Sequence, residues 1–504
     1  MFLDTLQNFA EVHPRKKAMV YKDRVVTYAE LQSRTNKIAN KMNSTGLQSG
    51  DRIAYLGKNS DRYFEALVGS MKAGVSMVPI NWRFSPAEVE HILNETRPKV
   101  IFVDREFKEV VNHAGSDLIL LDHDQAHDDF SEWYSTANDS VLLGRPLRDS
   151  AAIIMYTSGT TGLPKGAILS HGCLADRFDL EADTEDYDEV HLLWMPVCHL
   201  GGTTIGLGVF AKGGCNVVLR EFSPQLFLQN IETHQISRVI LVPAAMQQVM
   251  EHPDCASTDF GSLRCIGYGA SAMPPQLLER ALATFGVDFE QGYGCTELGG
   301  AVTKLGPADH TSGRHEVLLS AGKVIPGIEL SIQDDAGNLL SPLNHGEICV
   351  KSPTAMSGYW QNPDQTTNAF RNGWYLTGDI GYLDEEGYLF ISDRKKDMVI
   401  SGGENISAKE VENVLLDHPA VLDVAVIGIP DEHWGETVLA LVVPSDKNSF
   451  SESLLIEFCR GKLAHFKVPT KVSPIDELPR NATGKVQKNL LREPYWKGRD
   501  RRVS

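Results

Sequence analysis

The sequence lacks long apolar runs. No stretch approaches the ~18 consecutive apolar residues that a transmembrane helix requires, and the N-terminal segment MFLDTLQNFAEVHPRKK has no basic start followed by an apolar core. We therefore expect neither a membrane-spanning segment nor a signal peptide, and we place the protein in the cytoplasm. A peripheral contact with a membrane surface is left open.

The sequence also lacks paired cysteines and an excess of positive charge. Its 8 cysteines are scattered without a C-x-x-C pair, so we expect neither a zinc site nor disulfides, as in a reducing compartment. Lys and Arg number 48 against 66 Asp and Glu, which gives a formal net charge of −18. This balance argues against nucleic acid as the main partner, because binding it requires many phosphates to be neutralised by basic side chains.

The length and composition are those of a large globular protein. The chain has 504 residues, of which 42% are apolar and 23% charged. Such a chain is long enough for about three domain-sized units. The composition leaves the oligomeric state open, and a homodimer is one alternative.

Strand-like and helix-like segments alternate through the first part of the chain. DRIAYLG (51–57) reads as a strand, YFEALVGSMKAG (63–74) as a helix and VSMVPI (75–80) as the next strand. The alternation returns at 190–220 and 238–294. Strands that alternate with helices predict layered α/β units with parallel sheets.

The later part of the chain has a different pattern. EICVKS (347–352), WYLTGDIGYL (374–383) and YLFIS (388–392) are strand-like and are separated by turn residues, which predicts a β-rich unit. After Asp393, helix-like and strand-like segments are mixed over about a hundred residues. This pattern predicts a separate α+β domain.

One predicted hairpin brings two charged residues together. GYLDEEGYLFIS has turn residues at Asp384–Gly387 between two strand-like segments. Asp379 precedes this hairpin and Arg394 follows it. Antiparallel pairing should therefore place this acid and this base at the same end of the two strands.

The segment YTSGTTGLPKG, from Tyr156 to Gly166, is rich in glycine and hydroxyl groups and holds a single lysine, Lys165. It is not a Walker A loop, because Lys165 is followed by Gly166 rather than Ser or Thr and no helix begins there. AAIIMY before it and AILS after it are strand-like, so the loop joins two strands. Its backbone N–H groups, hydroxyls and lysine suit a polyphosphate.

YTSGTTGLPKG resembles the phosphate-loop motif of the AMP-forming acyl-CoA synthetases, which belong to the adenylate-forming superfamily. GYGCTE (292–297), YLTGD (375–379), DRKKDMVISGG (393–403) and PRNATGK (479–485) resemble the later motifs of that family, in its order and at its spacing. The resemblance runs from about Thr27 to Arg492. It implies a two-step reaction, in which a carboxylate is activated by ATP as an acyl-adenylate and is then transferred to the thiol of coenzyme A.

The resemblance also implies a fold. It is an α/β fold with a large N-terminal domain, made of two layered α/β subdomains and a β-rich barrel-like subdomain, followed by a small mobile α+β C-terminal domain. The corresponding ranges are an adenylation core at 1–393, a hinge at 394–396 and a mobile domain at 397–504. The C-terminal domain would rotate about Lys396 between the two steps.

The ATP-binding residues follow from the same resemblance. The loop would hold the β- and γ-phosphates, Glu297 would bind Mg²⁺, which prefers one or two carboxylates plus phosphate oxygens, and Thr296 would contact the α-phosphate. Tyr293 would lie on the adenine, beside Gly294 and the loop after residue 268, while Asp379 and Arg394 would bind the ribose. The implied loop residues are Thr157, Ser158, Gly159, Thr160, Thr161, Gly162 and Lys165, and those beside the adenine are Gly269, Ala270 and Ser271.

The remaining implied residues serve the acid and the thiol. Lys485 would neutralise the charge that develops during adenylation, and Gly402 and Gly403 would leave room for the pantetheine arm of coenzyme A. His199 would line the acyl-carboxylate pocket, although Cys198 stands where the family usually has an aromatic residue. Gly201 and Gly202 follow, and as small residues they are expected to leave depth in this pocket.

The sequence thus predicts an acid–thiol ligase that uses ATP, Mg²⁺ and coenzyme A and serves fatty acid metabolism. The SGGEN segment and the length resemble bacterial fatty-acid–CoA ligases, which makes a medium- or long-chain fatty acid the first interpretation. An aryl or cinnamic-type acid and a stand-alone enzyme that loads a carrier protein are alternatives. A nucleotide-binding protein without catalysis is disfavoured by the intact charged residues of the motifs, and a luciferase-like oxygenase would share the same scaffold.

Overall fold

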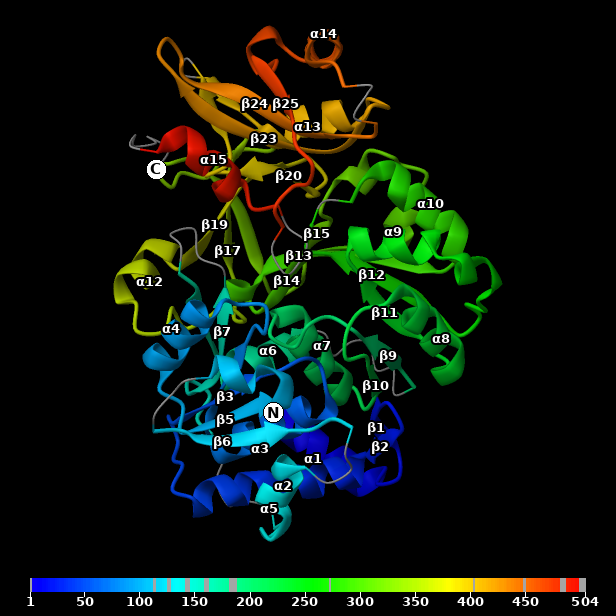
Figure 1. The fold of residues 1–504 in the computed structure, drawn as a ribbon, viewed down its shortest axis with the longest axis vertical. Coiled ribbons are helices and arrows are strands. Elements are labelled where there is room, and N and C mark those ends of the chain that lie inside the picture. Colours follow the sequence, from blue (N-terminus) through cyan, green and yellow to red (C-terminus); the bar gives the residue numbers. More distant parts are fainter. Residues whose placement is uncertain are drawn as a thin grey trace. The chain divides into compact units, whose positions relative to one another are not determined.

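The computed structural model describes residues 2–111, 115–124, 128–140, 146–157, 163–180, 188–271, 273–401, 404–446, 450–480 and 486–497. The chain forms two compact units (Figure 1). Unit 1 comprises Met1–Glu329 and Lys351–Tyr375, and unit 2 comprises Leu330–Val350 and Leu376–Ser504. None of the described helices is long and apolar enough to cross a membrane.

The first sheet of unit 1 has six strands in the order β6-β5-β3-β4-β7-β8. All neighbours are parallel except β7 and β8, which form an antiparallel pair. The segments β4 and β5 are buried along their whole length, as expected for parallel strands covered on both faces. The strands are β3 (Arg52–Leu56), β4 (Ser76–Ile80), β5 (Val100–Asp104), β6 (Asp117–Leu121), β7 (Ala151–Thr157) and β8 (Lys165–Ser170).

The second sheet of unit 1 has nine strands in the order β15-β14-β13-β12-β11-β9-β10-β1-β2. Its centre is parallel, and its two edges are antiparallel. The strands are β1 (Lys17–Tyr21), β2 (Arg24–Thr27), β9 (Val190–Leu193), β10 (Cys215–Val218), β11 (Arg238–Leu241), β12 (Cys265–Gly269), β13 (Asp288–Cys295), β14 (Gly300–Leu305) and β15 (Lys323–Val324). The predicted layered α/β architecture with parallel sheets is confirmed.

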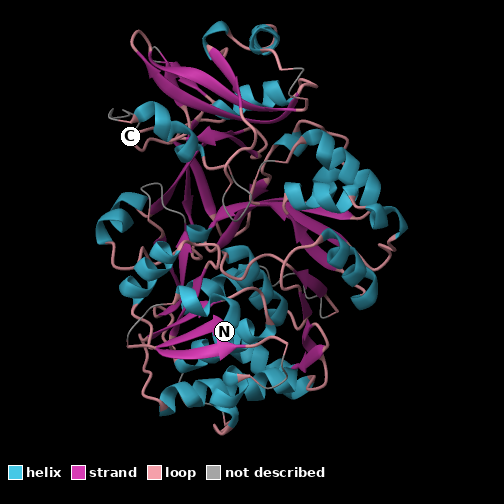
Figure 2. Cartoon of the chain, viewed as in Figure 1, coloured by secondary structure: helices cyan, strands magenta, loops and turns pink. Residues whose placement is uncertain are grey.

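Helices connect these strands (Figure 2). Local sequence sets several of their ends: Thr27 and Glu30 form a capping box at the start of α2, and Gly74 ends α3 in the left-handed conformation. The helices of unit 1 are α1 (Phe2–Val12), α2 (Tyr28–Ser44), α3 (Asp61–Ala73), α4 (Pro86–Thr96), α5 (Asp129–Ser135), α6 (His171–Leu180), α7 (Leu200–Ala211), α8 (Pro224–His234), α9 (Pro243–Glu251), α10 (Pro275–Phe285), α11 (Pro307–His310) and α12 (Pro363–Ala369).

A third sheet has five strands, which confirms the predicted β-rich region. Its order is β16-β17-β19-β18, and β20 pairs with β19. The predicted hairpin turn is present, since the Gly387 N–H donates to the Asp384 carbonyl at 3.1 Å and Gly387 has a φ of 84°. The strands are β16 (Glu329–Gln333), β17 (Gly346–Lys351), β18 (Phe370–Arg371), β19 (Trp374–Leu383) and β20 (Leu389–Arg394).

The last sheet lies wholly in unit 2 and has the order β22-β21-β24-β23, with β25 paired to β24. One face is covered by a cluster that includes Val411, Leu415 and Leu455, and Leu478 and Leu491 pack on Ala425 and Ile427 in a second cluster. The strands are β21 (Val399–Ser401), β22 (Glu404–Ile406), β23 (Val421–Asp431), β24 (Gly435–Pro444) and β25 (Lys471–Pro474), and the helices are α13 (Ala408–Leu416), α14 (Glu452–Arg460) and α15 (Lys488–Trp496). The predicted α+β region is therefore confirmed.

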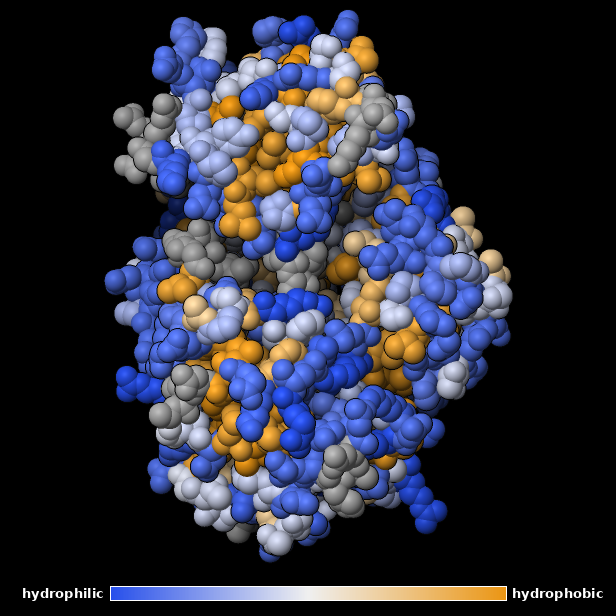
Figure 3. All heavy atoms as spheres, viewed as in Figure 1, coloured by the Kyte–Doolittle hydropathy of each residue, from blue (hydrophilic) through white to orange (hydrophobic). Residues whose placement is uncertain are grey.

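The surface drawn in Figure 3 is mostly hydrophilic, with apolar residues in separate areas. The most exposed large apolar side chains, Leu147, Leu339 and Leu422, belong to segments that are far apart in the sequence. A peripheral membrane contact stays a prediction.

Candidate active site

The phosphate loop connects the paired ends of two strands. Thr157 ends β7, Lys165 begins β8, and the two residues lie directly opposite each other in the antiparallel ladder. The predicted connection between two strands is confirmed, and the loop has no helix N-terminus behind it. Its central residues, Ser158, Gly159, Thr160, Thr161 and Gly162, lie outside the described residues.

Glu297 lies beside the start of this loop. It sits in a short 3-10 helix, Thr296–Leu298, that follows β13. Its Oε1 atom is 3.5 Å from the Thr157 hydroxyl. Lys165 interacts electrostatically with this carboxylate. Burial lowers the pKa of the lysine below its ordinary value, and the charge of Glu297 opposes that shift. The predicted phosphate loop and the predicted Mg²⁺ ligand therefore lie together.

Tyr359 is a neighbour of this site that the sequence did not indicate. Its hydroxyl donates to Glu297 Oε1 at 3.0 Å, and its ring centroid is 5.6 Å from the Lys165 ammonium nitrogen. Burial and the nearby carboxylate raise the pKa of Tyr359 above its ordinary value, so the phenol stays protonated and can donate. Tyr359 is 62 residues from Glu297, and no spacing in the sequence connects the two.

The Glu297 carboxylate fits a Mg²⁺ ion that is held mainly by phosphate oxygens. Its Oε1 atom has hydroxyl partners, and Oε2 accepts no hydrogen bond from the described residues. Within the described ranges, no three His, Cys, Asp or Glu side chains converge as metal ligands. A metal ion at Glu297 would therefore complete its shell with phosphate oxygens and water, as Mg²⁺ commonly does.

The predicted adenine-binding segments meet at the carboxyl ends of β12 and β13. Gly269 lies opposite Gly292 in the parallel pair, and Ala270 has a φ of 65°, a left-handed conformation that is uncommon for a residue with a Cβ. Ser271 follows, and Tyr293 is half-buried on β13, so it is not a core tyrosine. The carboxyl ends of parallel strands are where open α/β sheets bind ligands.

Gly294 and Gly269 are required by the packing of the strands themselves. A Cβ at Gly294 would lie 1.9 Å from the Gly300 carbonyl oxygen, and one at Gly269 would lie 2.5 Å from the Gly292 carbonyl oxygen. Both contacts are with rigid backbone. Their structural role is established by this geometry, and contact with the nucleotide stays a prediction.

His199 precedes α7 and is half-buried, with one ring nitrogen buried and unsatisfied. Its Nε2 atom has no hydrogen-bond partner among the described residues. Burial, and secondarily the charge of Arg83, lowers the pKa of His199 to about 4, so the imidazole is neutral at pH 7. A neutral ring with a free buried nitrogen can contact a substrate group.

The expectation that Gly201 and Gly202 leave depth in the acyl pocket is wrong. A Cβ at Gly202 would lie 2.3 Å from the Pro196 carbonyl oxygen, and one at Gly201 would lie 2.6 Å from the Met195 methyl group. The space beside both glycines is thus filled by the segment that precedes them. Cys198 is 3% exposed, so its thiol also faces the protein.

Asp379 and Arg394 are brought together in the third sheet, as the hairpin predicted. They are directly opposite in the antiparallel pair of β19 and β20, and Arg394 Nε lies 3.1 Å from Asp379 Oδ1. The Asp379 side chain is 10% exposed and that of Arg394 is 40% exposed. Both residues belong to the part of β19 and β20 in unit 2.

The family models decide the identity of this chain. The model of the AMP-binding enzyme family matches residues 6–360. The chain is an AMP-binding enzyme. A second model, that of the AMP-binding enzyme C-terminal domain, matches residues 410–485, which lie in unit 2.

Ligases that join acids to thiols are among the relatives of this AMP-binding enzyme. It is 36% identical to a fatty acid–[acyl-carrier-protein] ligase of Streptomyces coeruleorubidus, over 100% of this chain and 98% of the relative. It is 34% identical to an indoleacetate–CoA ligase of Aromatoleum aromaticum and 34% identical to a long-chain-fatty-acid–CoA ligase of Mycobacterium tuberculosis, each over 97% of both chains. The predicted class of enzyme, an acid–thiol ligase of the adenylate-forming family, is confirmed.

A solved structure shows the same fold. The o-succinylbenzoate coenzyme A synthetase of Bacillus subtilis, solved in complex with ATP and magnesium ion, superposes with a TM-score of 0.86 over 97% of this chain and 98% of that chain, at 31% identity. The predicted fold class of this AMP-binding enzyme is thereby confirmed. The relatives differ in their acids, and they do not fix the acid used here.

Three predicted site residues of the enzyme, Lys485, Gly402 and Gly403, lie outside the described residues. Lys396, the predicted pivot, lies between β20 and β21. The predicted hinge at 394–396 falls inside unit 2 rather than at a boundary between the two compact units. The domain ranges and the hinge stay predictions.

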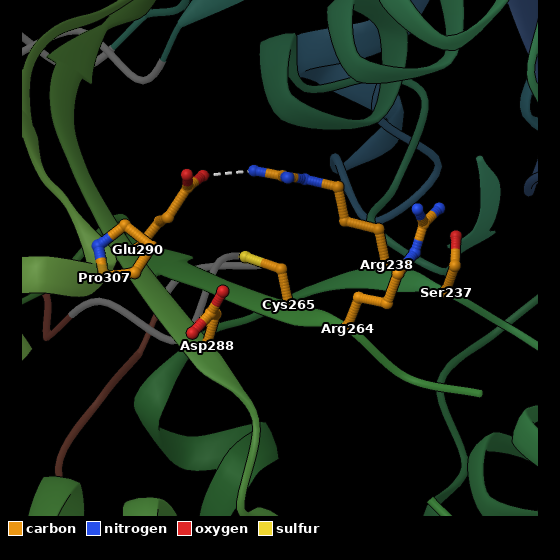
Figure 4. A pocket seen from close by; sticks show the side chains of 7 residues that line it. All are labelled: Ser237, Arg238, Arg264, Cys265, Asp288, Glu290 and Pro307. Carbon is orange, nitrogen blue, oxygen red and sulfur yellow. Dashed lines mark hydrogen bonds and ion pairs between the residues drawn. The ribbon is translucent and has the colours of Figure 1, made fainter. Parts of the chain in front are cut away.

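A surface cavity of about 200 Å³ lies at the other end of the second sheet (Figure 4). It is lined at the amino ends of β11, β12 and β13, whereas the candidate site is at their carboxyl ends. Glu290 in this cavity is paired with Arg238 and, at 2.7 Å, with Lys304. Because these charges already compensate one another, we assign no function to this cavity. Its lining residues are Ser237, Arg238, Arg264, Cys265, Asp288, Glu290 and Pro307.

Proposed function

We propose that this enzyme is an ATP-dependent carboxylate–CoA ligase that acts on a medium- or long-chain fatty acid. The observation that carries the proposal is the grouping of Thr157, Lys165 and Glu297 at the phosphate loop in a chain whose relatives include fatty-acid ligases. Three charged or hydroxyl groups at a loop that suits a polyphosphate support ATP as the activating substrate.

The proposed reaction has two steps. A carboxylate oxygen attacks the α-phosphorus of ATP, and the bond from that phosphorus to pyrophosphate breaks, which gives an acyl-adenylate. The sulfur of coenzyme A then attacks the acyl carbon, the bond to AMP breaks and the thiol proton passes to solvent. Activation is needed because a carboxylate has an electron-rich carbonyl and a poor leaving group.

The residues have distinct proposed roles in the first step. Glu297 would hold Mg²⁺, which balances charge on the phosphates when bound, while Lys165 and the loop would steady the departing pyrophosphate. Thr296 would contact the α-phosphate, and Lys485 would neutralise the charge that grows between the carboxylate and the phosphorus. Tyr293 with the segment Gly269–Ser271 would bind adenine, and Asp379 with Arg394 would bind the ribose.

The acid and the thiol would be served by other groups. His199, neutral and with a free buried nitrogen, would contact the acid, and rotation about Lys396 would replace Lys485 by Gly402 and Gly403 so that the pantetheine arm can enter. We place the enzyme in the cytoplasm, because its 8 cysteines are all free thiols. Whether the enzyme forms a homodimer is tested by measuring its molecular mass in solution.

A carrier protein is the alternative thiol, because a relative with 36% identity loads fatty acids onto one. The deciding experiment incubates the enzyme with ATP, Mg²⁺ and a panel of fatty and aryl acids, with CoA, holo-acyl-carrier protein or no thiol, and follows pyrophosphate, AMP and thioester. We expect thioester and AMP with fatty acids and CoA. If thioester forms only with the carrier protein, the carrier protein rather than CoA is the thiol acceptor. If thioester forms only with aryl acids, the substrate is an aryl acid rather than a fatty acid.

Glu297→Gln is the site variant for this assay, and Glu251→Gln, an exposed glutamate of α9, is its control. Glu297→Gln should strongly reduce pyrophosphate release at low Mg²⁺, whereas the control should behave as the parent enzyme. An unchanged Mg²⁺ requirement in Glu297→Gln would remove the metal role from this residue.

A further inference from the structure

The helix that follows Lys485 presents one face to the predicted hinge. Lys488 and Arg492 are four residues apart on α15 and therefore lie on the same side of the helix. Leu491 is 8% exposed and packs on β23 and β24, which fixes the rotation of α15 about its axis. Trp496 adds a hydrogen bond from its indole N–H to the Gly428 carbonyl at 2.9 Å.

Arg492 contacts the backbone and the side chain immediately after the pivot. Its Nη1 donates to the Lys396 carbonyl oxygen at 3.2 Å, and its Nη2 pairs with the Asp397 carboxylate. The Asp397 and Arg492 side chains are both 13% exposed. Burial acts to raise the pKa of Asp397, but the charges of Arg492 and Lys488 outweigh it and hold the pKa below its ordinary value.

The position of these contacts along the chain decides what they do. The Lys396 carbonyl belongs to the peptide group after the pivot Cα, so it moves with the C-terminal segment when the φ and ψ angles of Lys396 change. A bond from Arg492 to this carbonyl therefore survives rotation about Lys396. It ties the first peptide of the rotating body to α15.

The residues on either side of 481–485 pair with each other just before the same helix. Val486 pairs with Arg480 in an antiparallel bridge, and the Gln487 N–H donates to the Pro479 carbonyl at 2.7 Å. One residue further, the Lys488 ammonium lies 2.7 Å from Glu412 Oε1, and Glu412 also accepts the Val426 N–H at 2.8 Å. The segments on both sides of Lys485 are thus held to the same body that Arg492 ties to the pivot.

We infer that Arg492 is a positioning residue that couples the pivot at Lys396 to Lys485. In this arrangement α15 is a rigid link: its arginine holds the peptide after the pivot, and Lys488 at its start, two residues after Val486, is tied to Glu412 of α13. Rotation of the hinge would then carry Arg480 and Val486, the described residues on either side of Lys485, together with the peptide after the pivot. The inference rests on the proposed roles of Lys485 and of the hinge.

Loss of the Arg492 contacts to Lys396 and Asp397 should slow adenylation far more than thioester formation. Adenylation needs the Lys485 ammonium at the reacting atoms, and a misplacement of about 1 Å can cost about 100-fold in rate. Thioester formation from a supplied acyl-adenylate does not use Lys485 in the proposed mechanism. The two half-reactions therefore report separately on the link.

The test compares Arg492→Met with Lys462→Met, which removes an ion pair to Asp417 on the surface of the same unit. We expect Arg492→Met to slow pyrophosphate release about 10- to 100-fold and thioester formation from synthetic acyl-adenylate less than about threefold. The control should leave both rates unchanged. Equal losses in the two half-reactions of Arg492→Met would overturn the inference.

A double-mutant cycle separates coupling to Lys485 from a structural effect. In a Lys485→Ala background, Arg492→Met should slow adenylation no further, because the group that it positions is gone. A further full loss in the double variant would show a structural role and contradict the inference. Failure of Lys485→Ala alone to slow adenylation would instead contradict the proposed function.

Arg492→Lys is a second variant that keeps the test decisive if Arg492→Met does not fold. It keeps the charge beside Asp397 but lacks the planar fork that reaches both Asp397 and the Lys396 carbonyl. We expect native-like thermal unfolding and an adenylation rate between those of the parent and Arg492→Met. A parent-like adenylation rate in Arg492→Lys would show that the link to the Lys396 carbonyl is dispensable.

Discussion

Arg394 Nε lies 3.1 Å from Asp379 Oδ1, and the two residues are directly opposite on β19 and β20. The pair leaves Arg394 40% exposed while Asp379 is 10% exposed. An acid held in place by a neighbouring base can accept hydrogen bonds from two vicinal hydroxyl groups, as a ribose offers.

Replacing Asp379 by Asn tests whether the pair binds ribose. We expect the KM for ATP to rise about 10- to 100-fold, because hydrogen bonds to a charged group are lost. The rise should be much smaller with whichever of 2′-deoxy-ATP and 3′-deoxy-ATP lacks the bound hydroxyl, as measured by pyrophosphate release. Equal losses with all three nucleotides would leave Asp379 only a structural partner of Arg394.

Removal of the Tyr359 hydroxyl should weaken the binding of Mg²⁺ at Glu297. Tyr359→Phe takes away the donor that holds Glu297 Oε1 at 3.0 Å, and we expect the Mg²⁺ concentration for half-maximal rate to rise about three- to tenfold. Mg²⁺ titration at fixed ATP measures this. Tyr382→Phe, which removes a hydroxyl from a ring stacked on Phe390 in unit 2, is the control, and an identical Mg²⁺ response in both variants would refute the role of Tyr359.

His199, whose Nε2 atom is buried, should make the enzyme less stable in mild acid. Its pKa is about 4 in the folded protein against about 6.5 when unfolded, so the unfolded chain binds the extra proton first. Stability should fall as pH drops from about 6.5 to about 4, and this residue accounts for about 2 kcal/mol between pH 7 and pH 5. In urea unfolding, the free energy of unfolding of His199→Gln should fall less between pH 7 and pH 5 than that of the parent enzyme. The control His315→Gln, at an exposed histidine, should match the parent. Parallel losses in all three proteins would refute the assignment.

A methyl group at Gly294 should disrupt the β13–β14 hairpin. Its Cβ would lie 1.9 Å from the Gly300 carbonyl oxygen, and relieving such overlap costs about 1–3 kcal/mol or more. We expect Gly294→Ala to lower the midpoint of thermal unfolding by several degrees. Gly461→Ala, whose Cβ would meet only ordinary contacts at 3.6 Å and beyond, is the control. Equal midpoints for the two variants would contradict this account of β13.

The parts of the fold that were predicted have local causes. The pair Asp379–Arg394 follows from a hairpin whose turn is set by Asp384 and Gly387, because antiparallel register then fixes which residues face each other. The connection from Thr157 to Lys165 follows in the same way from two strand-like runs around a glycine-rich loop. Such features depend on neighbours in the sequence.

The parts that were missed depend on contacts between distant segments. Tyr359 reaches Glu297 across 62 residues, and Arg492 reaches Lys396 across 96, so neither has a local signal. The prediction for Gly201 and Gly202 is wrong because a glycine can either leave room in a pocket or allow close internal packing, and the sequence does not distinguish the two. Only the positions of Met195 and Pro196 show that these glycines allow close packing here.

The most direct test of the central claim follows an oxygen label. The enzyme is supplied with a fatty acid labelled with ¹⁸O in its carboxylate, together with ATP, Mg²⁺ and CoA, and the AMP and pyrophosphate are analysed by mass spectrometry. Attack of the carboxylate on the α-phosphorus predicts one ¹⁸O atom in AMP and none in pyrophosphate. Unlabelled AMP, or label in a phosphate other than the α-phosphate, would contradict the proposed acyl-adenylate.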